Sequence, residues 1–432
     1  MSRNPLSDYS GSFDPDAGFA SFSRQLLADL GREYLLNGHL QDRVGLPLVA
    51  KQFGGDAYVG VSIDEWMGAS PVYSKRMQRA LGFEGSDVGT VFKNLQIEIG
   101  APQQFMDFQF RLDSPEYGEF WLPHCGALLD VERFGEERVK LMCHDIEDPT
   151  FDATAAATHP CMKMRPIHRP PRTPADRYPH CRWSVFIGEE SQPYEQHPNL
   201  EIVARSKIAK LAIEPPADSA EPGGWEDYSG EFDPGMQPED LSHRALVILA
   251  QEVAVQSHLL ARSFMLCVSQ RLDDNTALEL GRAQWTGIAA LTAGRIQAPL
   301  GIEGDDIEAI AKVFQMHPCF HPRAYVDFSV EITGERSARI AIGDCPALQE
   351  SDAYSWFATL GEEPHPALDA IAGSVNPRAR CLPAPNPGSA ALAWDVTIDP
   401  DAEPRPDPKE LSLARISRGA RFQFERRRAL RA

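Results

Sequence analysis

Cysteine and histidine stand next to each other at three places in the first half of the chain, and both side chains can bind a metal ion. Thiolate sulfur and neutral imidazole nitrogen are ligands that zinc and iron prefer. The three pairs are His124-Cys125, Cys143-His144 and His180-Cys181. Each pair lies at or beside the end of a predicted strand, where one of two adjacent side chains can face a common point. The pattern predicts a zinc or iron site built from Cys125, Cys143, His144, His180 and Cys181, and its alternative is a cluster of buried thiols with surface imidazoles.

The same residues are also candidates for nucleophilic catalysis. A thiolate forms at neutral pH when a neighbouring base or positive charge lowers the pKa of the thiol. Cys125 and Cys143 are the candidate thiols, and the base would come from His124 or His144. This arrangement predicts either attack by a thiolate or, with a metal bound, attack by an activated water.

A proline-rich segment, residues 163–172, places three arginines close together in the chain. Proline restricts the backbone, and guanidinium groups bind carboxylate or phosphate in a bidentate way. We expect Arg165, Arg169, Arg172 and His168 to bind an anionic group of a small substrate. A solvated loop that pairs with nearby acidic residues is the alternative.

The chain contains the same domain twice. The pattern Tyr-Ser-Gly-x-Phe-Asp-Pro at residues 9–15 returns at residues 228–234, and the match continues for almost a hundred positions. A repeat this long is a whole domain rather than a solenoid unit. We assign residues 1–213 to the first repeat, 214–224 to a Pro- and acid-rich linker, 225–417 to the second repeat and 418–432 to a basic C-terminal tail. We expect the repeats to pair within the chain about a pseudo-twofold axis, with Phe108 and Phe328 in equivalent strands.

The two copies differ in their reactive residues, and the difference points to the first one. Most of the cysteines and histidines between residues 123 and 183 have aliphatic, Asn or Arg counterparts in the second copy. Cys125 is an exception, because Cys345 takes its place, so a shared core contact explains Cys125 as well as catalysis does. We therefore expect a catalytic first repeat and a degenerate second repeat that completes the pocket.

Each copy starts with helical patterns and ends with strand patterns. Apolar residues recur at helical spacing over residues 22–52 and 241–270, and two more helices follow in each copy. Alternation with a period of two then predicts strands at residues 106–113 and 326–333. Further strands are expected at 119–125, 138–143, 182–187, 339–345, 354–359 and 393–398, with short helices at 151–158 and 367–374. The order predicts an α+β fold in which about three helices precede an antiparallel sheet of about four strands in each copy.

Composition narrows the range of partners and compartments. The 432 residues carry a formal net charge of −20, which argues against nucleic acid as a partner. No run of about 18 apolar residues predicts a membrane span, and the N-terminal residues lack the apolar stretch of a signal peptide. We therefore expect a cytoplasmic protein whose eight cysteines are reduced. The arginine-rich tail, residues 418–432, is expected to dock on the acidic body, with an interaction tail for anionic partners as the alternative.

Several features of residues 105–187 occur in an order that resembles a known family. A predicted strand ends in Cys125, Cys143 follows after a short gap, and a Pro-Pro segment precedes Cys181-Arg182-Trp183. The order resembles the bacterial L-2-amino-thiazoline-4-carboxylic acid hydrolase-like domains, here in a tandem duplication. The resemblance implies hydrolysis of a C–N bond in a small heterocyclic carboxylate, with Cys125 or Cys143 as the catalytic thiol.

Together, these observations predict a small-molecule enzyme of the hydrolase or lyase class with its site in the first repeat. The alternative is a small-molecule-binding or sensor protein in which the cysteines and histidines form a structural metal site or a buried thiol cluster.

Overall fold

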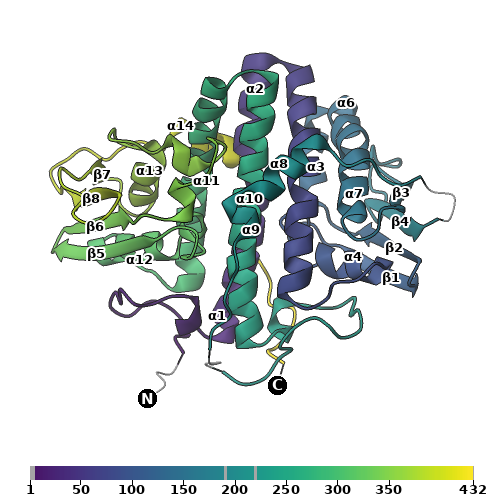
Figure 1. Ribbon diagram of the computed structural model, residues 1–432, viewed down its shortest axis with the longest axis horizontal. Coiled ribbons are helices and arrows are strands. Elements are labelled where there is room, and N and C mark those ends of the chain that lie inside the picture. The colour runs from purple at the N-terminus through teal and green to yellow at the C-terminus, as the bar shows by residue number, and fades with distance from the viewer. Residues whose placement is uncertain (1–4, 189–191, 218–220, 432) are drawn as a thin grey trace.

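Two four-stranded antiparallel sheets lie at opposite ends of the computed structural model, and long helices fill the space between them (Figure 1). The structure describes residues 5–188, 192–217 and 221–431. In each half the long helices come first in the chain and the sheet follows. The predicted α+β class is therefore confirmed.

The first repeat begins with α1 (Arg24–Leu40), α2 (Asp42–Phe53), α3 (Gly55–Ala80) and α4 (Val88–Leu95). Its sheet consists of β1 (Gln109–Ser114), β2 (Tyr117–Leu122), β3 (Met162–His168) and β4 (Cys181–Ile187). Between β2 and β3 the chain forms α5 (Gly126–Val131), α6 (Glu136–Lys140), a π-helical turn (Leu141–Ile146) and α7 (Glu147–Ala156). The repeat ends with α8 (Pro198–Arg205) and α9 (Lys207–Lys210).

The second repeat follows the same order with fewer helices between its strands. Its helices are α10 (His243–Arg271), α11 (Asp274–Leu300), α12 (Ile307–Met316), α13 (Pro366–Val375) and α14 (Lys409–Ala414). Its strands are β5 (Phe328–Gly334), β6 (Ser337–Ile342), β7 (Ala379–Pro383) and β8 (Leu392–Ile398). The single helix α10 corresponds to α1 and α2 together. Helices α1 and α2 are separated by Gln41 alone, and Pro47 lies inside α2 at the position equivalent to Leu266 of α10.

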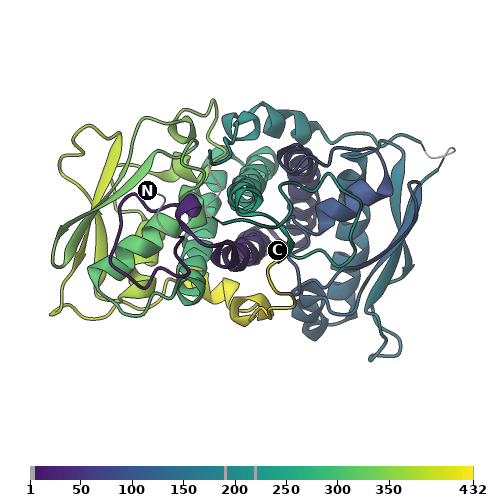
Figure 2. The same cartoon turned by 90° about the horizontal axis from the view of Figure 1, so that it is seen from below.

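The long helices form a bundle at the centre of the molecule, which Figure 2 shows from one end. Helix α10 packs against α1 and α3, and α11 packs against α1 and α2. Because α10 is apolar almost all round, it is buried on every side, as expected for a central helix. Among the described residues, no helix is long and apolar enough to cross a membrane.

The two sheets have the same topology and the same register. Their strand orders are β1-β2-β4-β3 and β5-β6-β8-β7. Phe110 pairs with Phe120 in the first sheet, and Val330 pairs with Ile340 at the equivalent place in the second. Helices α4 and α7 pack on the first sheet as α12 and α13 pack on the second. The strand pattern read from the sequence is therefore correct for β1, β2 and β4 in the first sheet and for β5, β6 and β8 in the second.

Each repeat extends an N-terminal segment onto the other repeat. The backbone N–H of Tyr9 donates to the carbonyl of Leu300 at 2.6 Å, and the N–H of Tyr228 donates to the carbonyl of Leu81 at 2.7 Å. The hydroxyl of Tyr9 donates to Gln315 at 2.7 Å, and that of Tyr228 donates to Gln96 at 2.8 Å. Lys312 and Lys93 then bind the carbonyls of Gly11 and Gly230, respectively. The same bonds thus occur twice with the repeats exchanged, which is the pattern of a twofold interface.

Two of the predicted strands are wrong. Residues 138–143 belong to α6 and the π-helical turn, and residues 356–359 form a 3-10 turn. Alternation over six residues also fits a short helix, so the period alone does not separate the two. The missing strands are β3 and β7, which contain Pro166 and Pro383. Both are edge strands, where a proline without an N–H is tolerated.

The linker has no regular structure where it is described, and the basic tail contacts both repeats. Residues 214–217 and 221–224 of the predicted linker form neither helix nor strand, and its other residues lie outside the described part of the chain. In the basic tail, Arg427 pairs with Asp107 at 2.7 Å and Arg428 pairs with Asp240 at 2.6 Å. The tail is therefore docked on acidic side chains, as its charge predicts.

Candidate functional site

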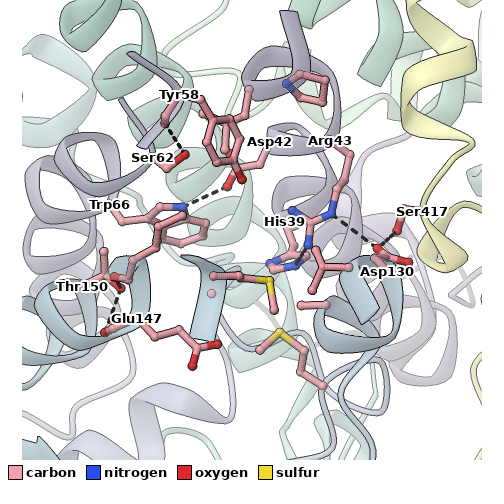
Figure 3. A pocket seen from close by; sticks show the side chains of 18 of the residues that line it. His39, Asp42, Arg43, Tyr58, Ser62, Trp66, Asp130, Glu147, Thr150 and Ser417 are labelled. Carbon is pink, nitrogen blue, oxygen red and sulfur yellow. Dashed lines mark hydrogen bonds and ion pairs between the residues drawn. The ribbon is translucent and has the colours of Figure 1, made fainter. Parts of the chain in front are cut away.

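A cavity of about 710 Å³ lies in the first repeat between α2, α3, the segment that leads into β1, and the helices after β2. Most of its walls are apolar or aromatic: Leu46, Pro47, Tyr58, Trp66, Tyr73, Leu95, Met106, Phe108, Val131, Phe134, Met142, Ile146 and Phe151. Its polar walls include His39, Asp42, Arg43, Ser62, Glu98, Asp130, Glu147 and Thr150 (Figure 3). Leu413, Ile416 and Ser417, from the end of the second repeat, complete the lining. The volume and the mixed lining are typical of a site for a small organic molecule.

Asp42 begins α2 and is almost completely buried, with a relative exposure of 4%. The indole nitrogen of Trp66 donates to its Oδ2 at 2.9 Å, and its Oδ1 has no hydrogen-bond partner among the described residues. Burial raises the pKa of Asp42, although the neighbouring Arg43 and the bond from Trp66 oppose this effect. One buried carboxyl oxygen of Asp42 thus lacks a hydrogen-bond donor.

Glu98 follows α4 and lies at a wall of the cavity with a relative exposure of 2%. Its carboxyl group accepts hydrogen bonds from Asn94 and, at 3.3 Å, from the hydroxyl of Ser74. Burial outweighs these two bonds and raises the pKa of Glu98 to about 7. The hydroxyl of Tyr73 lines the same cavity, and burial together with the charge of Glu98 raises the pKa of Tyr73.

Glu147 begins α7, directly after the π-helical turn. Its side chain extends from the helix toward the space between the other labelled residues in Figure 3. Burial raises the pKa of Glu147 to about 8, although Arg169 opposes the shift. Near neutral pH such a group can both donate and accept a proton, which is what general acid–base catalysis requires.

His39 and Arg43 line the same cavity as these carboxyl groups. His39 donates from Nδ1 to the carbonyl of Ile99 at 3.2 Å, so its Nε2 accepts from Arg43 at 3.3 Å. Burial and the charge of Arg43 lower the pKa of His39 to about 3, so this imidazole is neutral. Arg43 also pairs with Asp130 at 3.4 Å, and the backbone N–H of Arg418 donates to Asp130 at 2.8 Å. Asp130 therefore ties the C-terminal segment to the cavity wall.

In the second repeat, aromatic side chains fill the equivalent space. Trp285 and His258 correspond to Trp66 and His39, and the ring of Trp356 stacks on Trp285 with centroids 5.9 Å apart. The indole nitrogen of Trp356 donates to Gln284 at 3.1 Å. Phe357 packs against both Trp285 and His258, at 5.5 Å and 5.7 Å. The 3-10 turn that carries Trp356 and Phe357 occupies the place where the first repeat leaves a cavity.

The predicted catalytic thiols lie behind the cavity rather than in it. Cys125, Cys143 and Cys181 line a small adjoining cavity of about 10 Å³, and Glu147 borders both spaces. Burial raises the pKa of Cys125 to about 12 and raises the pKa values of Cys143 and Cys181 well above their usual range. The sulfur of Cys125 accepts the N–H of Leu128 at 3.3 Å and so caps α5. Thiols in this state are protonated at neutral pH and are weak nucleophiles.

The predicted imidazoles of the first repeat have the following contacts. The Nε2 of His144 donates to the carbonyl of Pro170 at 2.7 Å. The rings of His124 and His180 lie 6.3 Å apart, and burial lowers the pKa of both. Within residues 5–188, 192–217 and 221–431, no three His, Cys, Asp or Glu side chains are grouped so that they could hold a metal ion. Zinc or iron binding by these residues stays a prediction, which elemental analysis of protein purified without chelator would test.

The three predicted anion-binding arginines each have a carboxylate partner. Arg165 pairs with Asp152 at 2.8 Å, Arg172 pairs with Glu132 at 2.7 Å, and Arg169 pairs with Asp148. His168 lies in the edge strand β3, and burial lowers its pKa. None of these four residues lines the large cavity. The observed arrangement corresponds to the alternative expected for this segment, in which it pairs with nearby acidic residues.

The sequence pattern of cysteines, histidines and arginines in residues 123–183 does not indicate the cavity residues. His39, Arg43 and Trp66 have the same residue in the second repeat, which is typical of residues that serve the common fold. The sequence still contains a signal, because Asp42 corresponds to Ala261, Glu98 to His317 and Tyr58 to Ala277. Asp42 and Tyr58 are thus polar only in the first repeat, and Glu98 is acidic only there, which is the kind of difference that pointed to the cysteines.

Comparison with known proteins adds no relative: no protein-family model matches the chain, and neither a curated protein nor a solved structure is similar to it. The resemblance to the hydrolase-like domains therefore stays a prediction.

Proposed function

We propose that the protein is an enzyme of the hydrolase or lyase class that acts on a small organic molecule in the cavity of the first repeat. Hydrolysis and elimination both require a proton to leave one atom and to reach another. Glu147, Glu98 and Asp42 are the groups proposed to carry out these transfers, because burial raises the pKa of each toward neutrality. The observation that carries the proposal is that this carboxyl-lined cavity exists in the first repeat while Trp356 fills its counterpart in the second.

In this proposal Glu147 is the main proton carrier, and the thiols have a structural role. Glu147 has the highest pKa of the three cavity carboxyl groups, about 8, so at pH 7 it is mostly protonated and can act as the acid. Glu98, at about 7, is present in both forms and can act as the base. The buried thiols pack behind Glu147 and exclude water from that side. A metal ion bound by the predicted cysteines and histidines is the alternative source of a nucleophile.

The second repeat and the tail are proposed to complete the site. Leu413, Ile416 and Ser417 line the cavity, and the hydroxyl of Ser417 donates to Asp130 in its wall. Pairing of the repeats within one chain would then serve to hold this segment over the cavity. The eight cysteines are free, which fits the cytoplasmic location proposed from the sequence.

One observation favours a second candidate, a small-molecule-binding or sensor protein. A ligand in the cavity would touch Leu413 and Ile416, which continue into the tail that lies across both repeats. Binding could therefore change the position of a segment that both repeats hold. A protein of this kind would bind ligands without converting them.

The test begins with a thermal-shift screen of a small-molecule library against the wild-type protein and Ala50→Trp. Ala50 lines the cavity from α2, and a tryptophan there is expected to occupy it as Trp356 does in the second repeat. Glu362→Trp, at an exposed position of the second repeat, is the matched control. Compounds that stabilise the wild type and the control but not Ala50→Trp are cavity ligands. If no compound distinguishes Ala50→Trp from the control, the proposed site is wrong.

Cavity ligands are then incubated with the protein, and products are sought by mass spectrometry. We expect at least one ligand to be converted, and we expect Glu147→Gln to slow conversion at saturating ligand by about 100-fold, because glutamine cannot transfer the proton. Ligands that bind and are never converted would favour the sensor instead.

A further inference from the structure

We infer that the cavity binds an organic cation, in which an ammonium group is attached to an apolar or aromatic body. This inference rests on the proposed function and specifies the chemical class of its substrate. The features that lead to it are three cavity carboxyl groups without a counter-ion, surrounded by aromatic side chains.

Some buried carboxyl groups away from the cavity are paired with arginine, and Glu65, which does not line the cavity, is an exception. Glu33 pairs with Arg295 at 2.7 Å, and Glu252 pairs with Arg76 at 2.7 Å. Such pairing is the rule, because a buried charge without a partner is costly. By contrast, Asp42, Glu98 and Glu147 form no ion pair with any described residue, and all three line one cavity. A bound cation would supply the missing counter-ion for these groups.

An unused hydrogen-bond acceptor points to the same ligand. Asp42 is 4% exposed and lines the cavity, and its Oδ1 has no hydrogen-bond partner in the part of the chain that is described. A buried acceptor without a donor costs about 1–3 kcal/mol unless a ligand supplies one. An ammonium group has three donors and can satisfy it.

The walls between the carboxyl groups are also suited to a cation. Trp66, Tyr58 and Tyr73 line the cavity on α3, and Phe108 and Phe151 line it from the side of the sheet. The faces of such rings carry negative charge density and attract ammonium groups, with tryptophan the strongest. The same rings would cover the apolar part of the ligand.

Positive groups at the cavity either have a partner or lie near its opening. Arg43 pairs with Asp130 at 3.4 Å, and His39 is neutral. Lys51 and Phe134 are exposed, so the cavity meets solvent there. Arg138 lies over the ring of Tyr58, 4.1 Å from its centroid. None of these positive groups forms an ion pair with Asp42, Glu98 or Glu147 in the described part of the chain, so these three carboxyl groups are available to a cationic ligand.

The second repeat provides an internal comparison. Where the first repeat has Asp42 and Glu98, the second has Ala261 and His317. The space equivalent to the cavity is filled by Trp356 in the second repeat. Loss of the acids thus accompanies loss of the cavity. A purely structural role for Asp42 or Glu98 would have favoured the same residues in both repeats.

The experiment compares three probes of similar shape by titration calorimetry at pH 8: 4-phenylbutylamine, 4-phenylbutan-1-ol and 4-phenylbutyrate. We expect the amine to bind at least about 10-fold more tightly than the alcohol, and the carboxylate to bind most weakly. Asp42→Asn and Glu147→Gln should each reduce the preference for the amine over the alcohol, whereas the exposed control Glu362→Gln should keep it. Melting temperatures of all variants show that they are folded.

Each outcome decides between the two proposals. If the alcohol binds as tightly as the amine, the cation inference is wrong, while the cavity remains the binding site. If the carboxylate binds most tightly, or the amine does not bind, the inference is wrong and the anionic substrate expected from the sequence is favoured. Amine binding that is equally strong in Ala50→Trp would instead show that the cavity is not the site, and would contradict the proposed function itself.

Proton release gives a second readout that does not depend on the variants. Glu98 and Glu147 have pKa values raised to about 7 and about 8 by burial, and an ammonium group beside them would favour their charged forms. Binding of the amine at pH 7 should therefore release protons, which titrations in buffers of different ionisation enthalpy would measure. Amine binding without proton release would place the ammonium group away from these carboxyls and overturn the inference.

Discussion

In the first repeat the space beside Trp66 is a cavity of about 710 Å³, whereas in the second repeat Trp356 lies against the equivalent Trp285, with ring centroids 5.9 Å apart. The surrounding scaffold is the same in both. His39 and His258 occupy equivalent positions on the first long helices, and Phe110 and Val330 occupy equivalent positions in the sheets. The comparison separates the residues that form the fold from those that form the site.

The difference also concerns charge. The first repeat buries carboxyl groups that have no counter-ion, and the second repeat has neutral residues at the matching positions, such as Ala261 for Asp42. Buried carboxyl groups without a partner lower stability, and such groups occur at functional sites. The second repeat has a filled core at the equivalent place.

The largest expected effect comes from removing the aromatic side chain that fills the second repeat. Trp356→Ala should lower the free energy of unfolding by about 3–5 kcal/mol, because the surrounding core can collapse only partly onto the space that is left. Urea unfolding monitored by circular dichroism would measure the loss. Phe134→Ala, at the exposed rim of the first cavity, is the control and should change stability by less than about 0.5 kcal/mol. Equal losses in the two variants would contradict the difference in packing between the repeats.

An intermediate effect on stability is expected when Glu65 of the first repeat is replaced by glutamine, the residue at the equivalent position 284 of the second repeat. Glu65 is completely buried, neither of its carboxyl oxygens has a partner among the described residues, and Gln284 is its counterpart. Burial raises the pKa of Glu65, so the folded protein keeps the proton that the unfolded chain loses above about pH 4.5. Stability of the wild type should therefore decrease as pH rises from about 4.5.

Glu65→Gln removes this dependence, because glutamine resembles the protonated acid and does not ionise. We expect the variant to be more stable than the wild type by about 1–3 kcal/mol at pH 7 and equal to it at pH 4. Urea unfolding at both pH values gives the comparison. Destabilisation at pH 7 would mean that Glu65 is ionised and has a partner.

The smallest effect is expected at the cysteine that both repeats share. Cys125 and Cys345 are 5% and 3% exposed, and each lies after the second strand of its sheet. Cys125→Ala and Cys345→Ala should each cost about 1 kcal/mol of stability, through loss of a core contact. Once a substrate is identified, Cys125→Ala should retain turnover. Complete loss of turnover at unchanged stability would instead favour the thiol mechanism that the sequence suggested.

Local sequence patterns predicted the parts of the fold that depend on local structure. The alternation in residues 106–113 marked β1, and an apolar stripe marked α4, which Asp87 caps by accepting the N–H of Thr90 at 2.8 Å. The same method failed at residues 138–143, where six residues are too few to separate a strand from a helix. Edge strand β3 was missed because its proline suggests a loop.

The candidate site depends on contacts that no local pattern records. Asp42, Glu98 and Glu147 come from three separate parts of the chain and meet only after the bundle and sheet have formed. The cavity also depends on the absence of a bulky side chain, which becomes visible only when the structure shows Trp356 in the other repeat. Comparison of the two copies at acidic positions would have indicated Asp42 and Glu98, but not Glu147.

The crossing of the N-terminal segments has a consequence for the origin of the chain. Tyr9 binds the second repeat and Tyr228 binds the first through the same bonds. A single repeat alone would therefore have neither a partner for its N-terminal segment, here called its arm, nor an arm bound to its own surface. Two identical subunits would satisfy these surfaces by exchanging arms. We infer that the ancestor was an arm-exchanged homodimer with two equal sites, and that gene fusion placed both subunits under one reading frame. After fusion, mutation could fill one site with aromatic side chains and leave the other intact, which a symmetric homodimer cannot do.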